Sequence, residues 1–185
     1  MRVIAGKYKS RRLRSLPGAK TRPTSDKLRE TLFNVLTAGN PASLENSVWL
    51  DIFAGTGAVG IEALSRGASL VTFIDNARSA TLVIKENLRS LEVEGGFDVL
   101  EQDAQNALPK VNRQAGYIFV DPPYADHEAY TDTLALLSQS SIVGPASQVI
   151  VEHGKRYDPG QSFGKLERYR TLLQGDSGLS FYRKS

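Results

Sequence analysis

The sequence contains no cysteine, which removes several kinds of chemistry at once. Without thiols there can be no disulfide, no zinc site with thiolate ligands and no cysteine nucleophile. Histidine is also scarce, and neither His127 nor His153 has an obvious orienting partner, so we expect both in surface loops. The sequence therefore predicts no metal site, and it shows no group of residues arranged for hydride transfer.

Long apolar runs are missing as well. No stretch reaches the roughly 18 apolar residues of a membrane span, and the N-terminus lacks the apolar segment of an export signal. We therefore expect a cytoplasmic protein without a membrane partner. A hydrophobic content of 41% with 23% charged residues is ordinary for a globular chain. Its 185 residues suffice for one main domain with a small appendage, and we expect a monomer.

Acidic residues are nearly absent from the N-terminal part of the chain. Residues 1–29 hold ten Lys and Arg against Asp26 alone, so this segment carries +9 and the remainder −6 of the net +3. A basic arm on an acidic body favours a polyanionic partner, although a solvated, mobile tail is the alternative. We divide the chain into a basic extension, residues 1–24, and one domain, residues 25–185.

Hydrophobic periodicity predicts alternating strands and helices after this extension. Ser25 is a candidate N-cap for a helix that Gly39 and Pro41 would end. Strands are predicted at residues 48–53, 70–74, 97–100, 117–120 and 149–151, and helices at 58–66, 77–88 and 128–137. This alternation indicates an α/β fold with a mostly parallel sheet. Residues 166–173 and 179–182 read as a C-terminal antiparallel hairpin.

A glycine-rich loop follows the first predicted strand. Gly55, Gly57 and Gly60 form the pattern G-x-G-x-x-G where a helix begins, and Asp75 lies 20 residues beyond Gly55. Glycines permit a tight turn and a close ligand, and the helix N-terminus offers free N–H groups. The spacing suits a dinucleotide as well as other nucleoside cofactors, with the acid on the ribose hydroxyls. The motif alone does not separate these cofactors.

Three carboxylates near the loop refine this interpretation. Asp51 precedes the loop, where it would repel a pyrophosphate but engage an ammonium group or a water, so a cationic amino-acid cofactor suits it better. Asp103 follows the third strand and is a candidate acceptor for an adenine amino group. Each has a structural alternative, because Asp75 and Asp103 would also cap the following helices and Asp51 would also pair with the basic arm.

The segment Asp121-Pro122-Pro123-Tyr124 directly follows an apolar strand. A carboxylate, a prolyl carbonyl and an aromatic ring meet there, and the prolines stiffen the loop and remove two backbone donors. Such a loop suits a flat base that carries an amino group, and ligands of open α/β sheets bind at the carboxyl ends of strands. The alternative is that the Asp-Pro pair only makes a turn.

With these motifs in this order, the chain resembles S-adenosylmethionine-dependent amino-methyltransferases. More narrowly, it resembles the bacterial family that methylates N2 of guanine 966 in 16S ribosomal RNA. The similarity includes residues 2–9, residues 21–26 and the helix after them, and so covers most of the chain. The N-terminal segments are its specific part, because the glycine loop and the Asp-Pro-Pro-Tyr motif are shared widely. Phe would be equally expected in place of Tyr124, and either ring can stack.

The resemblance implies a Rossmann-like, seven-stranded methyltransferase sheet and 16S rRNA, within a small-subunit particle, as the partner. Its implied cofactor-binding residues are Asp51, Phe53, Gly55, Thr56, Gly57, Asp75, Asn76, Asp103 and Ala104. Its implied catalytic residues are Asp121, Pro122, Pro123 and Tyr124, which would grip the target base. The basic extension then becomes RNA-binding, through Lys7, Lys9, Arg11, Arg12, Arg22, Thr24 and Lys27.

Three other functions remain open. A DNA adenine-N6 methyltransferase uses similar motifs, but such enzymes generally need a target-recognition domain, for which residues 125–185 leave little room. A non-catalytic RNA-binding module would use only the basic extension, although both the cofactor loop and the target loop are intact. An NAD-dependent oxidoreductase is the weakest of the three.

Overall fold

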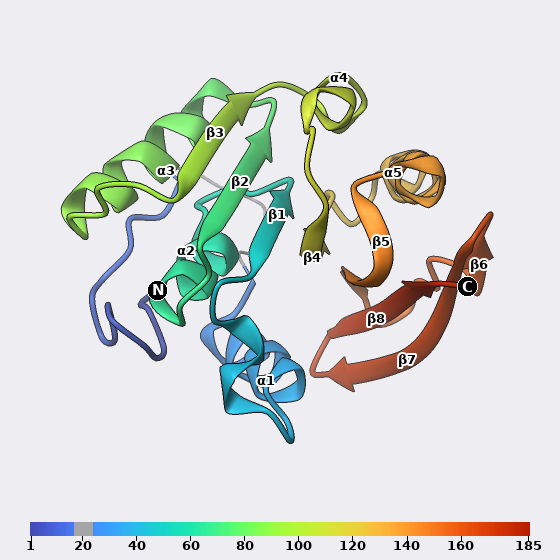
Figure 1. The fold of residues 1–185 in the computed structure, drawn as a ribbon, viewed down its shortest axis with the longest axis horizontal. Coiled ribbons are helices and arrows are strands. Elements are labelled where there is room, and N and C mark those ends of the chain that lie inside the picture. The colour runs from blue at the N-terminus through green and yellow to red at the C-terminus, as the bar shows by residue number, and fades with distance from the viewer. Residues whose placement is uncertain (17–23) are drawn as a thin grey trace.

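An eight-stranded, mixed sheet runs through the molecule in the order β3-β2-β1-β4-β5-β8-β7-β6 (Figure 1). The computed structural model describes residues 1–16 and 24–185. Strands β3, β2, β1, β4 and β5 are parallel to one another, and β8, β7 and β6 continue the sheet in antiparallel pairing. The predicted fold class is confirmed, with the two-residue β6 as an additional edge strand.

The helices and strands lie as follows. The helices are α1 (Asp26–Leu36), η1 (Pro41–Leu44), α2 (Ala58–Ser65), α3 (Arg78–Ser90), α4 (Ala104–Ala107), η2 (Leu108–Lys110) and α5 (His127–Gln139). The strands are β1 (Val48–Ile52), β2 (Leu70–Asp75), β3 (Phe97–Glu101), β4 (Ala115–Val120), β5 (Val143–Gly154), β6 (Ser162–Phe163), β7 (Leu166–Gln174) and β8 (Ser177–Lys184).

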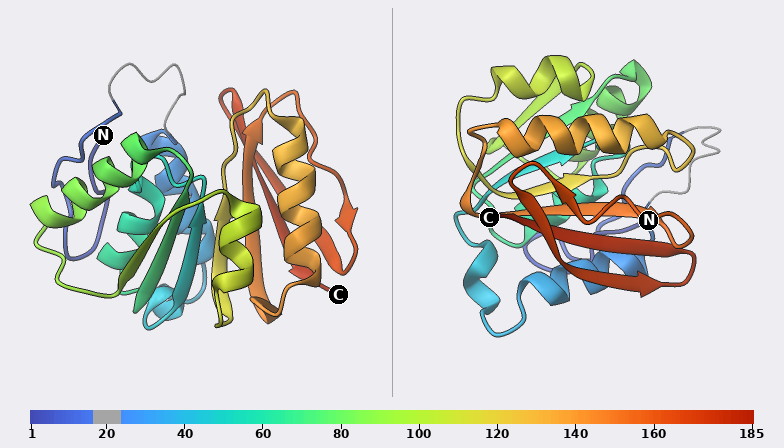
Figure 2. Two further views of the ribbon diagram at one scale, coloured as in Figure 1. Left: turned by 90° about the horizontal axis from the view of Figure 1, so that it is seen from above. Right: turned by 90° about the vertical axis from the view of Figure 1, so that its right-hand side faces the viewer.

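Helices cover both faces of the sheet and enclose two apolar clusters (Figure 2). Helices α1, α2 and α3 pack on one face, where Trp49 stacks between Phe33 and Tyr117 with ring centroids 5.4 and 4.8 Å away. Helices α4 and α5 pack on the other face. Strands buried on both sides in this way explain the continuous apolar runs in the sequence.

Most predicted elements are confirmed to within a few residues, and α1 shows why. Its N-cap is Ser25, whose Oγ accepts a hydrogen bond from the Leu28 N–H at 3.1 Å. Strand β5 begins earlier than predicted, at Val143, because its first half, VGPASQ, contains no continuous apolar run from which a strand would be predicted. There the pairing with β4 shifts register, and the Ser147 hydroxyl joins the Gly144 N–H to the Ala115 carbonyl.

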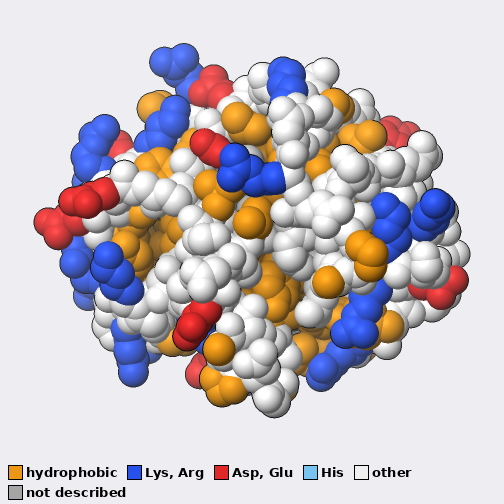
Figure 3. All heavy atoms as spheres, viewed as in Figure 1, with side chains coloured by type: hydrophobic (Ala, Val, Ile, Leu, Met, Phe, Trp, Pro, Cys, Tyr) orange, Lys and Arg blue, Asp and Glu red, His pale blue; other side chains and the backbone are white. Residues whose placement is uncertain are grey.

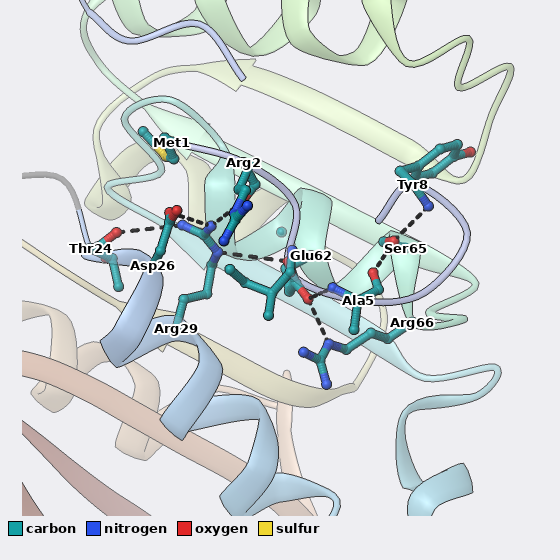
Figure 4. Close-up of polar contacts among 12 residues, drawn as sticks. Met1, Arg2, Ala5, Tyr8, Thr24, Asp26, Arg29, Glu62, Ser65 and Arg66 are labelled. Atoms are coloured by element: carbon teal, nitrogen blue, oxygen red, sulfur yellow. Dashed lines mark hydrogen bonds and ion pairs between the residues drawn. The ribbon is translucent and has the colours of Figure 1, made fainter. Parts of the chain in front are cut away.

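The N-terminal segment, residues 1–16, lies along α2 and α3 (Figures 1 and 4). Val3, Tyr8 and Leu13 are buried in the same apolar cluster as those helices. The carboxylate of Glu62 on α2 accepts hydrogen bonds from the N–H groups of Ile4 and Ala5, at 2.7 and 3.0 Å. This part of the basic extension is therefore folded onto the domain.

The described helices are short relative to a bilayer. Within residues 1–16 and 24–185, no helix is long and apolar enough to cross a membrane.

Candidate active site

The glycine loop leaves β1 in a conformation that favours glycine. Gly55 and Gly57 have φ values of 55° and 75°, and Phe53 also has a positive φ of 62°. A Cβ added at Gly57 would lie 3.1 Å from Ile84 and 3.3 Å from Phe73, so the loop is packed closely against α3 and β2. Glycine is required here for its φ and for its size.

Thr56, between these glycines, is tied to α3. Its carbonyl accepts a hydrogen bond from Nδ2 of Asn87 at 3.0 Å. Oδ1 of the same Asn87 accepts the N–H of Arg14 at 2.7 Å. The loop, α3 and the N-terminal segment thus share one buried amide side chain.

Asp75 holds the glycine loop from the end of β2. Its Oδ2 accepts the N–H of Gly55 at 2.8 Å and its Oδ1 accepts the N–H of Ala77 at 2.9 Å. Asn76, beside it, is exposed. Each carboxylate oxygen has more than one lone pair, so these bonds leave acceptor capacity for ribose hydroxyls. The cofactor role of Asp75 and Asn76 stays a prediction.

Asp51 is buried beneath the loop, with 2% of its surface exposed. Its Oδ2 accepts the N–H of Gly60 in α2 at 2.9 Å. Burial raises the pKa of the Asp51 carboxyl to about 7, with a further increase from the charge of Asp75 and an opposing effect of the Gly60 hydrogen bond. The structure gives Asp51 a structural bond within the domain, and contact with a cofactor ammonium stays a prediction.

Asp103 is the N-cap of α4, which was the structural alternative to adenine binding in the sequence analysis. The backbone N–H and the side-chain amide of Asn106 both donate to its carboxylate at 2.8 Å, and these bonds lower its pKa. The side chain is exposed at the carboxyl edge of the sheet, and Ala104 after it is buried. Contact between Asp103 and an adenine amino group stays a prediction.

The Asp-Pro-Pro-Tyr loop lies beside the glycine loop, because β4 and β1 are neighbours. Val120 is paired with Ile52, and the N–H of Asp121 donates to the Ile52 carbonyl at 3.2 Å. The Thr24 hydroxyl lies 3.4 Å from Oδ2 of Asp121. Burial, then the charges of Glu152 and Asp51, raise the pKa of the Asp121 carboxyl well above its usual range.

The two prolines orient their carbonyls differently. The Pro122 carbonyl accepts the hydroxyl of Tyr130 on α5 at 3.2 Å, while the Pro123 carbonyl accepts the N–H of Asp126 at 2.8 Å. A carbonyl oxygen has two lone pairs, so the bond from Tyr130 leaves acceptor capacity at Pro122. Pro123 belongs to the turn that leads into α5.

Tyr124 is fixed at both ends of its side chain. Its hydroxyl donates to Oε1 of Glu152 at 3.0 Å and lies 2.9 Å from the Ser177 hydroxyl. Its ring lies against Gly154, where an added Cβ would come within 3.4 Å of the ring. Burial and the charge of Glu152 raise the pKa of Tyr124. About a third of the residue is exposed, and stacking of its ring on a base stays a prediction.

Sequence reasoning missed Glu152 and Tyr130, and it gave Thr24 only an RNA contact. The buried Glu152 accepts the Thr24 hydroxyl at 2.6 Å, so Thr24 lies in the site rather than on the surface. A signal for Glu152 was present, because it follows the apolar run of β5 as Asp121 follows that of β4. A pocket of about 140 Å³ adjoins it, lined by Ser25, Lys27, Glu152, Gln174, Gly175, Asp176 and Ser177.

The other predicted RNA-binding residues are spread over the N-terminal segment and α1. Lys7, Lys9, Arg11 and Arg12 are exposed. In Figure 3, Lys and Arg side chains lie over the side of the N-terminal segment, mixed with Asp and Glu, and also over the opposite side. Lys27 is exposed beside Glu152. Arg22 lies outside the described residues.

The expectation for His153 was wrong. This residue is buried in β5, with its ring nitrogens 3.0 Å from the Gly154 carbonyl and from the Ser180 hydroxyl, and burial lowers its pKa. The sequence could not show this, because Ser180 comes from β8. His127 is exposed, as expected, but it is the first residue of α5 and does not lie in a loop, and its ring stacks on Tyr157. In the part of the chain that the structure describes, no cluster of three or more His, Asp or Glu is arranged for a metal ion.

The donor set at this edge of the sheet fits a cationic nucleoside cofactor better than a dinucleotide. Asp75 and Asp103 present carboxylates at the ends of β2 and β3, and Asp51 and Asp121 lie at β1 and β4. The carboxylates of Asp75 and Asp103 would repel a pyrophosphate and accept hydrogen bonds from hydroxyl and amino groups, and a nearby cation would favour the ionised form of the buried Asp51 carboxyl.

Comparisons with known proteins show the family of the chain. A model of the family described as "Conserved hypothetical protein 95" matches residues 1–183. The chain is 34% identical to ribosomal RNA small subunit methyltransferase D of Haemophilus influenzae, over 99% of this chain and 92% of that protein. It is 33% identical to the Escherichia coli protein of the same name, over 82% and 74%. The solved structure described as "Putative methyltransferase yhhF from Escherichia coli" superposes with a TM-score of 0.82 at 30% identity, covering 100% of this chain and 97% of that one.

Proposed function

The chain belongs to the family described as Conserved hypothetical protein 95, and from this premise we propose that it methylates 16S rRNA of the small ribosomal subunit. The proposed acceptor is the exocyclic N2 amine of a guanine, guanine 966, and the proposed methyl donor is S-adenosylmethionine. The observation that carries the proposal is the adjacency of two loops, in which the Asp121 N–H donates to the carbonyl of Ile52 just before the glycine loop.

The proposed cofactor site is the carboxyl edge of β1, β2 and β3. The cofactor would contact the backbone of Gly55, Thr56 and Gly57, next to Phe53. Its ribose hydroxyls would bind Asp75 and Asn76. Asp103 and Ala104 would contact the adenine, and Asp51 would favour the cationic end. When bound there, S-adenosylmethionine supplies an electrophilic methyl group on a positively charged sulfur.

Residues of the second loop would prepare the acceptor. A guanine amine is a weak nucleophile because its lone pair is delocalised into the ring. The Asp121 carboxylate and the free lone pair of the Pro122 carbonyl would accept its two hydrogens, at about 2.7–3.2 Å, and so aim the nitrogen lone pair at the methyl group. Tyr124 would stack on the base and fix its plane. In-line attack then depends chiefly on orientation, and the surplus proton leaves to water.

Basic residues of the N-terminal segment would hold the RNA. Lys7, Lys9, Arg11 and Arg12 are proposed to contact phosphates without reading sequence, and Arg22, Thr24 and Lys27 to approach the pocket. The base itself must leave its stack to reach Tyr124, and stacking on the ring offsets part of that cost. A ribosomal RNA acceptor would place the reaction in the cytoplasm.

Radiolabelled S-adenosylmethionine tests the proposal directly. The protein is incubated with small-subunit particles, naked 16S rRNA or duplex DNA, and the labelled nucleotide is then mapped. We expect label at one guanine N2 of the rRNA. Label in DNA but not in rRNA would favour an adenine-N6 methyltransferase. Binding of RNA without any transfer would favour the non-catalytic module.

A further inference from the structure

Glu152 connects three parts of the site. It follows Val151 in β5, which is paired with Val120 in β4, so Glu152 and Asp121 are neighbours at the same edge of the sheet. Its side chain is buried, with 2% of the residue exposed. One carboxylate oxygen accepts the Tyr124 hydroxyl at 3.0 Å and the other accepts the Thr24 hydroxyl at 2.6 Å. A single side chain thus holds the stacking ring and the residue that precedes α1.

The Thr24 hydroxyl stands between two carboxylates and has only one proton to donate. It lies 2.6 Å from Glu152 and 3.4 Å from Asp121, so the stronger bond goes to Glu152. Two hydroxyl donors stabilise negative charge on Glu152. Asp121 receives the longer bond and faces that charge, which makes Asp121 the carboxyl that more readily keeps a proton.

The other groups around Asp121 strengthen this asymmetry. Asp51 on β1 adds a second carboxylate, and the hydroxyl of Tyr130 on α5 is directed to the Pro122 carbonyl. The Tyr124 hydroxyl, from the same loop, donates a hydrogen bond to Glu152. Among the described residues that line the adjoining pocket, the charged ones besides Glu152 are Asp176 and the exposed Lys27. In keeping with this geometry, burial first and then Glu152 and Asp51 raise the pKa of Asp121.

We propose that Glu152 is a positioning residue for methyl transfer. Its two oxygens fix Tyr124 and Thr24, and its charge sets the pH range in which Asp121 is an ionised acceptor for the target amine. This inference rests on the proposed function for the roles of Asp121 and Tyr124. It adds a residue outside both loops that controls the geometry of one side chain and the protonation of another.

Two substitutions distinguish the effect of the Glu152 charge from the effect of its side-chain length. Glu152→Gln keeps the size of the side chain but removes the charge, so the Asp121 titration should move to lower pH, by about one to two units. Glu152→Asp keeps the charge but shortens the side chain, so the titration should stay within about half a unit of wild type. Glu152→Asp should instead release Tyr124 and lower kcat by about tenfold or more.

The titration is measured without any RNA, by ¹³C NMR of aspartate carboxyl groups, with Asp121→Asn identifying the signal. A Glu152→Gln midpoint equal to that of wild type would overturn the inference. Circular dichroism establishes that each variant is folded. Should Glu152→Gln fail to fold, Thr24→Val is the second test, since it removes the shared donor and leaves both charges. Its Asp121 midpoint should rise, and a fall or no change would overturn the inference.

Methyl transfer to small-subunit particles supplies the second readout. For wild type, kcat should increase with pH as Asp121 ionises, and Glu152→Gln should move that rise to lower pH. Glu152→Asp should leave the rise in place while lowering kcat. The matched control is Glu167→Gln on the exposed side of β7, which should behave as wild type. A wild-type protein that methylates no rRNA refutes the proposed function, whereas an active wild type with an unmoved Glu152→Gln midpoint and pH profile refutes only the role of Glu152.

Discussion

Substitution of the single residue Asp121 should affect methyl transfer but not cofactor binding. Its carboxylate is proposed to accept the target amine, while the glycine loop and Asp75 are proposed to hold the cofactor. Asp121→Ala should therefore lower methyl transfer by about 100-fold or more and leave cofactor affinity within about threefold of wild type. Calorimetry with S-adenosylmethionine and a transfer assay measure the two quantities. A large loss of cofactor affinity would mean that Asp121 belongs to the cofactor site.

The raised pKa of Asp51 should make the free energy of unfolding depend on pH. Its pKa is raised from 3.8 to about 7, so the folded protein keeps a proton that the unfolded chain releases. The stabilising contribution is complete below about pH 4 and is lost as pH rises through about 7, on the order of 4 kcal/mol in total. Asp51→Asn keeps an acceptor for the Gly60 N–H and carries no charge. In urea unfolding, the free energy of unfolding of Asp51→Asn minus that of wild type should be larger at pH 8 than at pH 5. An equal difference at the two pH values would contradict a raised pKa for Asp51.

At the scale of elements, the decisive contact joins the N-terminal segment, α1 and α2 (Figure 4). Arg29 is fully buried, with its Nε 3.8 Å from Glu62, and its guanidinium donates to the Arg2 carbonyl and to Asp26. Glu62 in turn binds the N–H groups of Ile4 and Ala5 and the side chain of Arg66. The carboxylate of Glu62 thus compensates a buried charge and anchors the first residues of the chain.

Removing this carboxylate should be costly, because the buried Arg29 loses one of its two acidic partners and the N–H groups of Ile4 and Ala5 lose their acceptor. We expect Glu62→Ala to destabilise the fold by roughly 3–5 kcal/mol in chemical unfolding and to speed hydrogen exchange at the amides of residues 4 and 5. Glu86→Ala is the matched control. Its ion pair with Arg14 is largely exposed, so the change should stay within about 0.5 kcal/mol. Similar losses in both variants would contradict the anchoring role of Glu62.

For the whole molecule, charge distribution governs the proposed encounter with RNA. Residues 1–29 carry +9 on a remainder of −6, and the exposed Lys7 and Lys9 lie on the N-terminal segment. RNA affinity should fall as salt rises, because bound counterions are released from phosphates. The double variant Lys7→Ala/Lys9→Ala should lower the slope of log affinity against log salt by about 1.5, whereas Lys110→Ala on the opposite face should not. An affinity independent of salt would remove the electrostatic role.

The sequence by itself determined the order of elements and the two loops. Apolar runs, the Ser25 cap and the glycine pattern are local signals, because periodicity, capping and φ preferences act within a few residues. The position of Asp121 at a strand end also follows from its neighbours. These features were sufficient for the fold class and for the resemblance to a methyltransferase family.

Only the tertiary structure decided what those residues touch. It folded residues 1–16 onto α2 and α3, buried His153, and brought Thr24 and Glu152, which are 128 residues apart in the sequence, together beside Asp121. Such contacts depend on strand order and on side-chain burial, which no local pattern encodes. In an unfolded chain every aspartate has about the same pKa. In the folded protein, its pKa depends on burial, on neighbouring charges and on hydrogen-bond partners, which the tertiary structure brings together.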